Sequence, residues 1–132
     1  MKQFEEMKFN IGELTGISAD SITEHLKLYA GYVKHANLIL SKIEEMSKDA
    51  EANAYALGEL QRRFGFEFDG MRNHEYYFKS LEGQATPLSP ESTLTQAIAQ
   101  EWGSFDAWLV RFKAIALTRG IGWAILYYDK TT

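Results

Sequence analysis

Three observations in the sequence predict a mainly α fold, as the helical part of an α+β architecture. Apolar residues recur every three or four positions over two long stretches, 19–47 and 57–81, as in amphipathic helices that pack together. Both prolines lie within residues 84–90, which marks a linker. A short apolar run at residues 123–128 has the composition of a buried strand.

The composition narrows the possible classes of protein. The 132 residues correspond to about one ordinary domain, and 14 basic residues against 18 acidic ones form no long block of either sign, so we expect no nucleic acid partner. The absence of cysteine excludes disulfides and Cys-ligated metals. Glu5 and Glu6 stand where a secretory signal would be basic and then apolar, and no apolar run approaches the roughly 20 residues of a membrane span. We therefore expect a cytoplasmic protein without a membrane partner.

The first long period predicts a helix over about residues 19–47, preceded by an extended lead-in at residues 1–17. Ser18 or Ser21 can cap this helix, and Asp20 lies in its first turn, where the helix dipole favours an acid. Its apolar face consists of Ile22, Leu26, Tyr29, Val33, Ala36, Leu40 and Ile43.

The second long period predicts one long helix, or two collinear ones, that end at Glu82–Gly83. The apolar period is interrupted around Asp49, where we expect the chain to reverse direction. The two helices would then form an antiparallel hairpin, which we interpret as a domain over residues 1–83. The apolar face of the second period consists of Leu57, Leu60, Phe64, Phe68, Met71, His74, Phe78 and Leu81.

Beyond the linker at residues 84–90, residues 91–132 are interpreted as the start of a C-terminal α/β domain. The order Ser89-Pro90-Glu91 predicts a helix that runs to Gly103, and Ser104 can cap another that runs to Arg119–Gly120. Residues 123–128 would then form the first strand of an incomplete antiparallel sheet, because a lone strand cannot satisfy its backbone groups.

Two of the three histidines are expected to meet inside the hairpin. His25 lies 24 residues before Asp49 and His74 lies 25 residues after it, so an equal helical rise places them at about the same height. Two imidazoles that face each other across a hairpin can bind a metal ion. The alternative, that each is a core histidine with a hydrogen-bond partner, stays open at this point.

Other residues near this height have competing interpretations. Tyr32 lies two helical turns after His25 on the same face, so its hydroxyl could approach the same cavity, although a tyrosine on a helix flank is more often core packing. His35 lies among polar neighbours and is expected to be solvated.

Three blocks of the sequence resemble the iron/manganese superoxide dismutase family. The segment Ile17–His25 resembles the family's first helix up to its first ligand histidine, and Asn73–Phe78 resembles the Asn-His segment that holds the second. Gly103–Lys113 resembles its Gly-Ser-Phe helix, and Gly120–Leu126 resembles the Gly-Ser-Gly-Trp-x-Trp-Leu segment that begins a strand.

The resemblance implies roles for particular residues. His25 and His74 would bind an iron or manganese ion, and Trp123 would line the metal cavity. Tyr32 resembles the tyrosine that gates the site, although it lies one residue closer to the ligand histidine than in the family. Gly70, four residues before His74, resembles manganese-type members.

The implied function is dismutation of superoxide to dioxygen and hydrogen peroxide, in a homodimer or higher oligomer. The largest departure from the family is that no Asp-x-Trp-Glu-His segment, which would supply the third and fourth ligands, follows residue 126. Two further functions therefore remain open, a non-catalytic helical interaction module and an inactive truncated relative.

Overall fold

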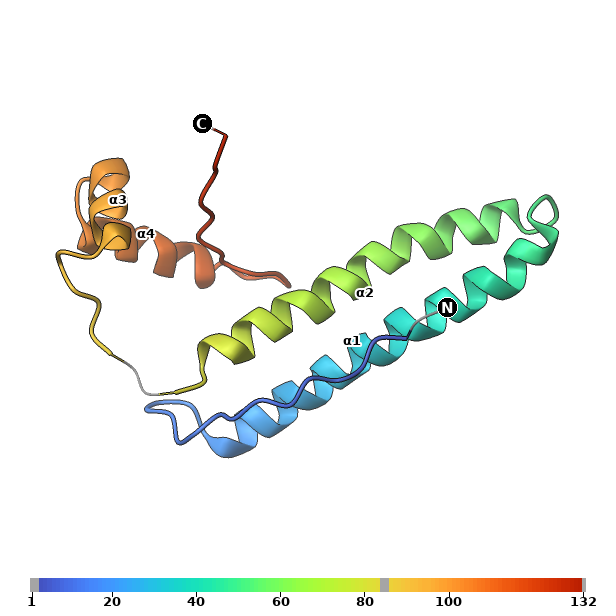
Figure 1. The fold of residues 1–132 in the computed structure, drawn as a ribbon, viewed down its shortest axis with the longest axis horizontal. Helices are drawn as coiled ribbons and strands as arrows, with labels where there is room; N and C mark the ends of the chain where they lie inside the picture. The colour runs from blue at the N-terminus through green and yellow to red at the C-terminus, as the bar shows by residue number, and fades with distance from the viewer. Residues whose placement is uncertain (1–2, 84–85, 132) are drawn as a thin grey trace. The chain divides into compact units, whose positions relative to one another are not determined.

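The computed structural model describes residues 3–83 and 86–131, so residues 84 and 85 of the predicted linker lie outside the described residues (Figure 1). The chain divides into two units, Met1–Gln84 and Ala85–Thr132. The predicted mainly α fold is confirmed. The helices are α1 (Ala19–Met46), the short 3₁₀ helix η1 (Ser47–Asp49), α2 (Ala54–Ser80), α3 (Thr93–Trp102) and α4 (Phe105–Ala116).

In the first unit, α1 and α2 lie side by side as an antiparallel hairpin (Figure 1). The hydroxyl oxygen of Ser18 caps α1 by accepting a hydrogen bond from the N–H of Ser21 at 3.1 Å. At the turn, the Asn53 amide donates to the carbonyls of Met46 and Asp49, at 3.3 and 2.9 Å. These bonds satisfy carbonyls at the ends of α1 and η1, where no partner remains within the helix.

The core of the hairpin lies where the apolar stripes of α1 and α2 meet. Tyr29 and Val33 of α1 pack with Met71 and Phe78 of α2, and each of the four is at most 4 % exposed. All four belong to the apolar faces predicted from the sequence. The second helix is continuous, because the packing of this stripe offsets the cost of the glycines within it.

The N-terminal segment completes this core, a role that its aperiodic sequence did not indicate. It runs along α1, with the amide of Asn37 accepting from the N–H of Phe4 at 2.8 Å and donating to its carbonyl at 2.9 Å (Figure 1). The Phe9 ring packs between Tyr29 and Phe78, with ring centroids 5.7 and 5.3 Å away. The segment therefore covers the open side of the two-helix core.

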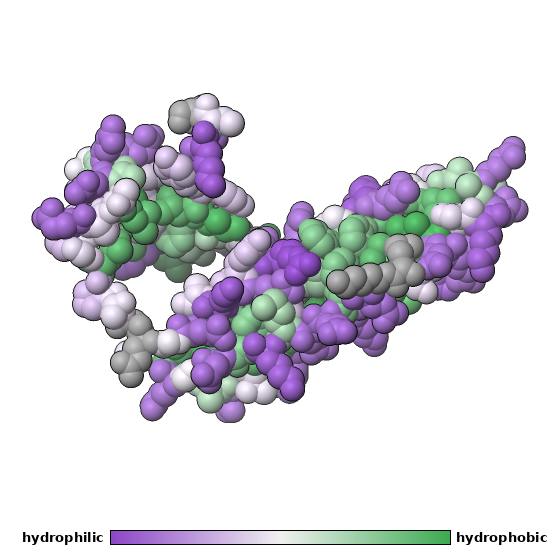
Figure 2. All heavy atoms as spheres, viewed as in Figure 1, coloured by the Kyte–Doolittle hydropathy of each residue, from purple (hydrophilic) through white to green (hydrophobic). Residues whose placement is uncertain are grey.

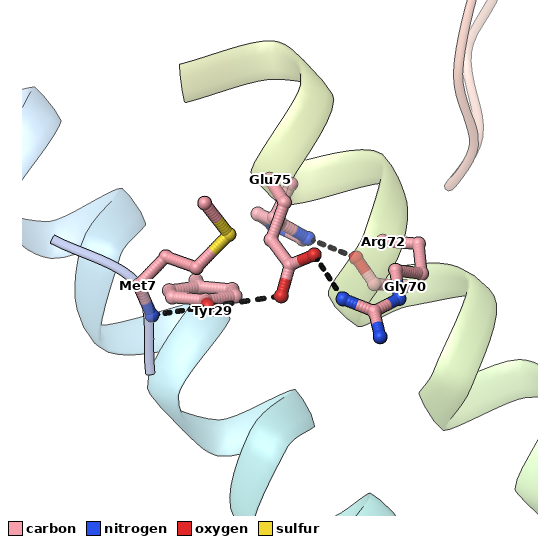
Figure 3. Close-up of polar contacts among 6 residues, drawn as sticks. Met7, Tyr29, Gly70, Arg72 and Glu75 are labelled. Atoms are coloured by element: carbon pink, nitrogen blue, oxygen red, sulfur yellow. Dashed lines mark hydrogen bonds and ion pairs between the residues drawn. The ribbon is translucent and has the colours of Figure 1, made fainter. Parts of the chain in front are cut away.

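A buried carboxylate links all three pieces of this unit (Figure 3). The Tyr29 hydroxyl accepts from the N–H of Met7 at 2.9 Å and donates to Glu75 Oε1 at 3.1 Å. Arg72 pairs with the other carboxylate oxygen at 2.5 Å, although Glu75 is only 7 % exposed. Burial, with a further contribution from the charge of Glu75, raises the pKa of Tyr29, so its hydroxyl keeps the proton that it donates.

The second unit contains α3 and α4. Ser104 caps α4 as predicted, but α3 begins at Thr93 rather than after Pro90, because the hydroxyl of Ser92 accepts from the N–H of Thr95 at 3.1 Å. The earlier Ser89 instead accepts from Glu91 at 3.2 Å, in a turn. The sequence therefore contained two serines able to begin a helix, and the later one does so.

The strand predicted at residues 123–128 is wrong. These residues are irregular. Within the described ranges, 3–83 and 86–131, they form no hydrogen-bonded β-ladder with another segment. A strand exists only through pairing with a neighbour, and its apolar composition alone does not provide one. Across the same described ranges, no helix is both long and apolar enough to cross a membrane.

The contribution of the Tyr29 hydroxyl to stability can be tested by a substitution that removes only this group. We expect Tyr29→Phe to lower the free energy of unfolding by about 1–3 kcal/mol, because it removes a donor from a buried carboxylate and an acceptor from the Met7 N–H. Urea unfolding followed by circular dichroism measures this change. Tyr76→Phe, the same change on a side chain that is 71 % exposed, should stay within about 0.5 kcal/mol. Equal effects of the two variants would contradict the importance of this network.

Candidate metal centre

His25 of α1 and His74 of α2 meet inside the hairpin, as their distances from the turn predict. Their ring centroids lie 4.8 Å apart, and the rings are inclined at 77°, edge to face. His74 is buried, at 5 % exposure, and His25 is half-buried. The two helices therefore bring together two imidazoles that are 49 residues apart in the sequence.

Aromatic rings surround the pair. The His25 ring contacts Tyr77 and Phe78 with centroid distances of 5.1 and 5.0 Å. The Tyr32 ring lies 5.0 Å from that of His74. This wall limits the access of water and lowers the local dielectric, so charges and hydrogen bonds inside it interact more strongly than in solvent.

A backbone carbonyl orients the His74 ring. Nδ1 of His74 lies 2.6 Å from the carbonyl oxygen of Gly70, one helical turn earlier. Because a carbonyl oxygen only accepts, Nδ1 carries the hydrogen and the lone pair of the neutral ring is on Nε2. Metal-binding histidines commonly have this second bond, which holds the ring and selects the nitrogen that binds.

The surroundings of both histidines favour the neutral form that binds metal, because they lower the pKa of each imidazole. Burial lowers the pKa of His25, and the nearby imidazole of His74 lowers it further. Burial also lowers the pKa of His74, against a smaller opposing effect of its bond to Gly70. Neutral imidazole is the form with a lone pair to donate, so this environment suits a cation better than a proton.

Tyr32 lies directly over Gly70. A β-carbon added at Gly70 would lie 2.5 Å from Cδ1 of the Tyr32 ring and 3.0 Å from its Cζ, closer than non-bonded atoms approach. The absence of a side chain at Gly70 therefore lets Tyr32 lie beside His74. Three residues that the sequence singled out thus occupy one place in the hairpin.

The pair can supply two ligands to one ion. With metal–nitrogen distances of about 2.0–2.1 Å, two imidazoles on a shared ion have centroids about 5 Å apart, close to the spacing seen here. Within residues 3–83 and 86–131, however, no group of three or more His, Cys, Asp or Glu side chains could hold a metal ion. His35 is exposed, as predicted, and Trp123 belongs to the second unit.

Sequence reasoning missed Glu75, which follows His74 directly and, like His74, contacts Tyr29 of α1. Its carboxylate binds Tyr29 and Arg72, and so secures the turn of helix that carries His74. The spacing of Arg72 and Glu75, three residues apart on a helix, was a signal for an ion pair. Its burial was not visible from the sequence, because its partner Tyr29 is 46 residues away.

The C-terminal part of the chain matches a known family model. Residues 90–132 match the model described as "Iron/manganese superoxide dismutases, C-terminal domain". This range covers α3, α4 and the irregular segment that follows, and it does not include the hairpin.

Relatives in several bacteria cover both units. The superoxide dismutase [Fe] of Mycobacterium tuberculosis is 34 % identical over 127 residues, 94 % of this chain and 60 % of the relative. The superoxide dismutase [Mn] of Mycolicibacterium smegmatis is 32 % identical over the same shares. That of Mycobacterium intracellulare is 37 % identical over 106 residues, 80 % of this chain and 50 % of the relative.

The chain thus spans about 60 % of the length of the first of these relatives, with a match that extends through both the hairpin and the second unit. The relatives carry either iron or manganese in their names, so the likeness is to the family as a whole and not to one metal type. Over nearly its whole length this chain is therefore similar to iron and manganese superoxide dismutases, and its residues 90–132 match the C-terminal domain model of that family.

Proposed function

We propose that this chain carries part of a superoxide dismutase site, in which His25 and His74 bind an iron or manganese ion. The reaction converts two superoxide ions and two protons to dioxygen and hydrogen peroxide. The observation that carries the proposal is the meeting of two neutral imidazoles across the hairpin, with Nδ1 of His74 bonded to the Gly70 carbonyl. The names of the relatives support this choice of metal and substrate.

The residues present fit one half of such a site. His25 and His74 would donate through their lone pairs, and the surrounding aromatic rings would limit water. When bound, the metal supplies one-electron redox chemistry. Two imidazoles hold an ion weakly, so the activity requires further ligands that the described residues do not bring to this place.

We propose that Tyr32 orders solvent or an anion at the metal site. Its ring lies against that of His74, where its hydroxyl could order solvent or an incoming anion beside the bound ion. Trp123 resembles the family's cavity tryptophan, and its role stays a prediction. The cytoplasmic location and the oligomeric state are likewise proposals.

One observation favours a second function, that of a non-catalytic helical interaction module. Among residues 3–83 and 86–131, His25 and His74 gain no third ligating neighbour at the site. In this case the two rings would serve only as core packing between α1 and α2. Metal uptake separates the two functions, because core packing requires no ion.

The first prediction here concerns metal uptake. We expect the purified protein to bind manganese or iron and to gain thermal stability when the metal is added, because the metal binds only the folded state. His25→Gln and His74→Gln should each weaken binding by about tenfold or more, as measured by metal content and by the shift in Tm.

His35→Gln is the matched control, because His35 is an exposed histidine of the same helix as His25. It should bind metal as the wild type does. If the wild type takes up no ion and its Tm does not respond to added metal, the interaction module replaces the metal site as the proposed function.

A second prediction concerns pH and follows from the two lowered pKa values. Because the unfolded chain then binds protons more readily than the folded one, the free energy of unfolding is highest above pH about 6.5. It should fall as the pH decreases through about 6.5 towards the lower folded values. Urea titrations with a chelator measure this slope, which should be shallower in the His25→Gln/His74→Gln protein than in the wild type.

A third prediction tests the contact of Tyr32 with Gly70. Gly70→Ala should lower the free energy of unfolding by about 1–3 kcal/mol, because its β-carbon would overlap the Tyr32 ring. Gly58→Ala, in the same helix with no atom within 4 Å of the new carbon, should raise it by about 0.5–1 kcal/mol. In a Tyr32→Ala background the cost of Gly70→Ala should largely disappear. A similar cost in both backgrounds would mean that the ring does not cause it.

A further inference from the structure

The N-terminal segment packs on the hairpin through two aromatic side chains. Residues 3–13 form neither helix nor strand, and within residues 3–10 the side chains of Phe4 and Phe9 are half-buried while the other six are exposed. Figure 2 shows hydrophobic residues between hydrophilic ones on the visible face of the hairpin, where this segment runs along α1. A segment with so few buried apolar contacts has the properties of a region that opens locally, at a free energy below that of global unfolding.

The backbone of this segment is bonded to side chains of α1. The amide of Asn37 exchanges two hydrogen bonds with the backbone of Phe4, and the N–H of Met7 donates to the Tyr29 hydroxyl. These bonds join exposed or half-buried groups to the helix surface, so water can replace them when the segment leaves. The net cost of breaking each one is therefore modest.

The hairpin keeps its own core when this segment is away. The four buried residues of the core all come from α1 and α2. The buried carboxylate of Glu75 likewise receives its bonds from Tyr29 of α1 and Arg72 of α2 (Figure 3). Departure of the segment thus removes a cover and leaves both the core and the buried ion pair in place.

We propose that residues 3–10 form a strap that leaves the hairpin as a unit while α1 and α2 stay paired, and that its departure gives solutes access to His74. Phe9 packs on both Tyr29 and Phe78. The centroids of these two rings lie 6.4 and 6.1 Å from that of His74. Phe9 is therefore the outer layer of the aromatic wall on this side, and it moves with the strap.

The strap acts as a unit because its attachments lie on one short stretch of chain. Release of Phe4 lowers the effective concentration of Met7 and Phe9 at their own contacts, in the way that losing one site of a multivalent ligand weakens the others. Opening of the strap would then set the rate at which the candidate metal centre exchanges its ion. This last consequence rests on the proposed function, whereas the opening itself does not.

The test measures access to His74 in the full chain without metal, by reaction with diethyl pyrocarbonate located by mass spectrometry. His74 should react much more slowly than the exposed His35. Asn37→Ala, which releases Phe4, should raise the rate at His74 about fivefold or more. Asn37 lies 12 residues after His25, about 18 Å along α1, so an effect at this distance indicates transmission through the strap.

Asn53→Ala is the matched control, because the Asn53 amide bonds to the turn of the hairpin and not to the strap. It should leave the rate at His74 within about twofold of the wild type. Asn37→Asp provides a milder variant, since its carboxylate still accepts from the N–H of Phe4 but cannot donate to the carbonyl. It should give a smaller acceleration, and it replaces Asn37→Ala if circular dichroism shows that the latter has lost its helices.

Amide hydrogen exchange followed by NMR tests whether the strap opens as a unit. In Asn37→Ala the N–H groups of Phe4 and Met7 should lose protection by the same factor, whereas that of Val33 in α1 should keep its protection. Loss at Phe4 alone would overturn the proposal, because it would show local fraying.

Two further results would also overturn it. The first is an unchanged rate at His74 in a variant whose strap amides have lost protection, because the strap would then not shield the ring. The second is equal acceleration by Asn37→Ala and Asn53→Ala, which would show general loosening of the hairpin. Failure of the chain to bind metal would contradict the proposed function but would leave these measurements, and the strap, unaffected.

Discussion

Neither α1 nor α2 can bury its apolar stripe alone, and the first unit depends on the packing of these two stripes against each other. The packing of Tyr29 and Val33 against Met71 and Phe78 removes four side chains almost completely from water. Two helices leave one side of such a core open, and the N-terminal segment covers it with Phe9. The buried Glu75 is stable there because Tyr29 and Arg72 both donate to it.

The candidate metal centre is a consequence of the same packing. Once the stripes are in register, His25 and His74 must lie at one height, and the bare backbone at Gly70 leaves room for Tyr32 beside them. The Gly70 carbonyl then bonds to Nδ1 of His74 without any further residue being needed. Burial lowers the pKa of both imidazoles and so favours the neutral form that can bind a cation, which gives the pair structural and chemical roles in one environment.

In the second unit, the apolar segment after α4 does not adopt the structure that its composition favours. Residues 123–128 have the composition of a strand but remain irregular, because the stability of a strand lies in bonds to a neighbour. Exposed and half-buried side chains nevertheless alternate from Trp123 to Tyr127.

The sequence by itself determined the helices, their facing stripes and the common height of His25 and His74, because helical period and rise depend only on local spacing. Only the tertiary structure decided which groups are buried together: Glu75 with Tyr29, Phe9 with Phe78, and Tyr32 over Gly70. It also decided that Ser92 begins α3 and that residues 123–128 form no strand. The burial of these groups depends on contacts between residues far apart in the chain. The start of α3 depends on which of two capping serines, Ser89 or Ser92, begins the helix. The apolar periodicity of the sequence specifies neither.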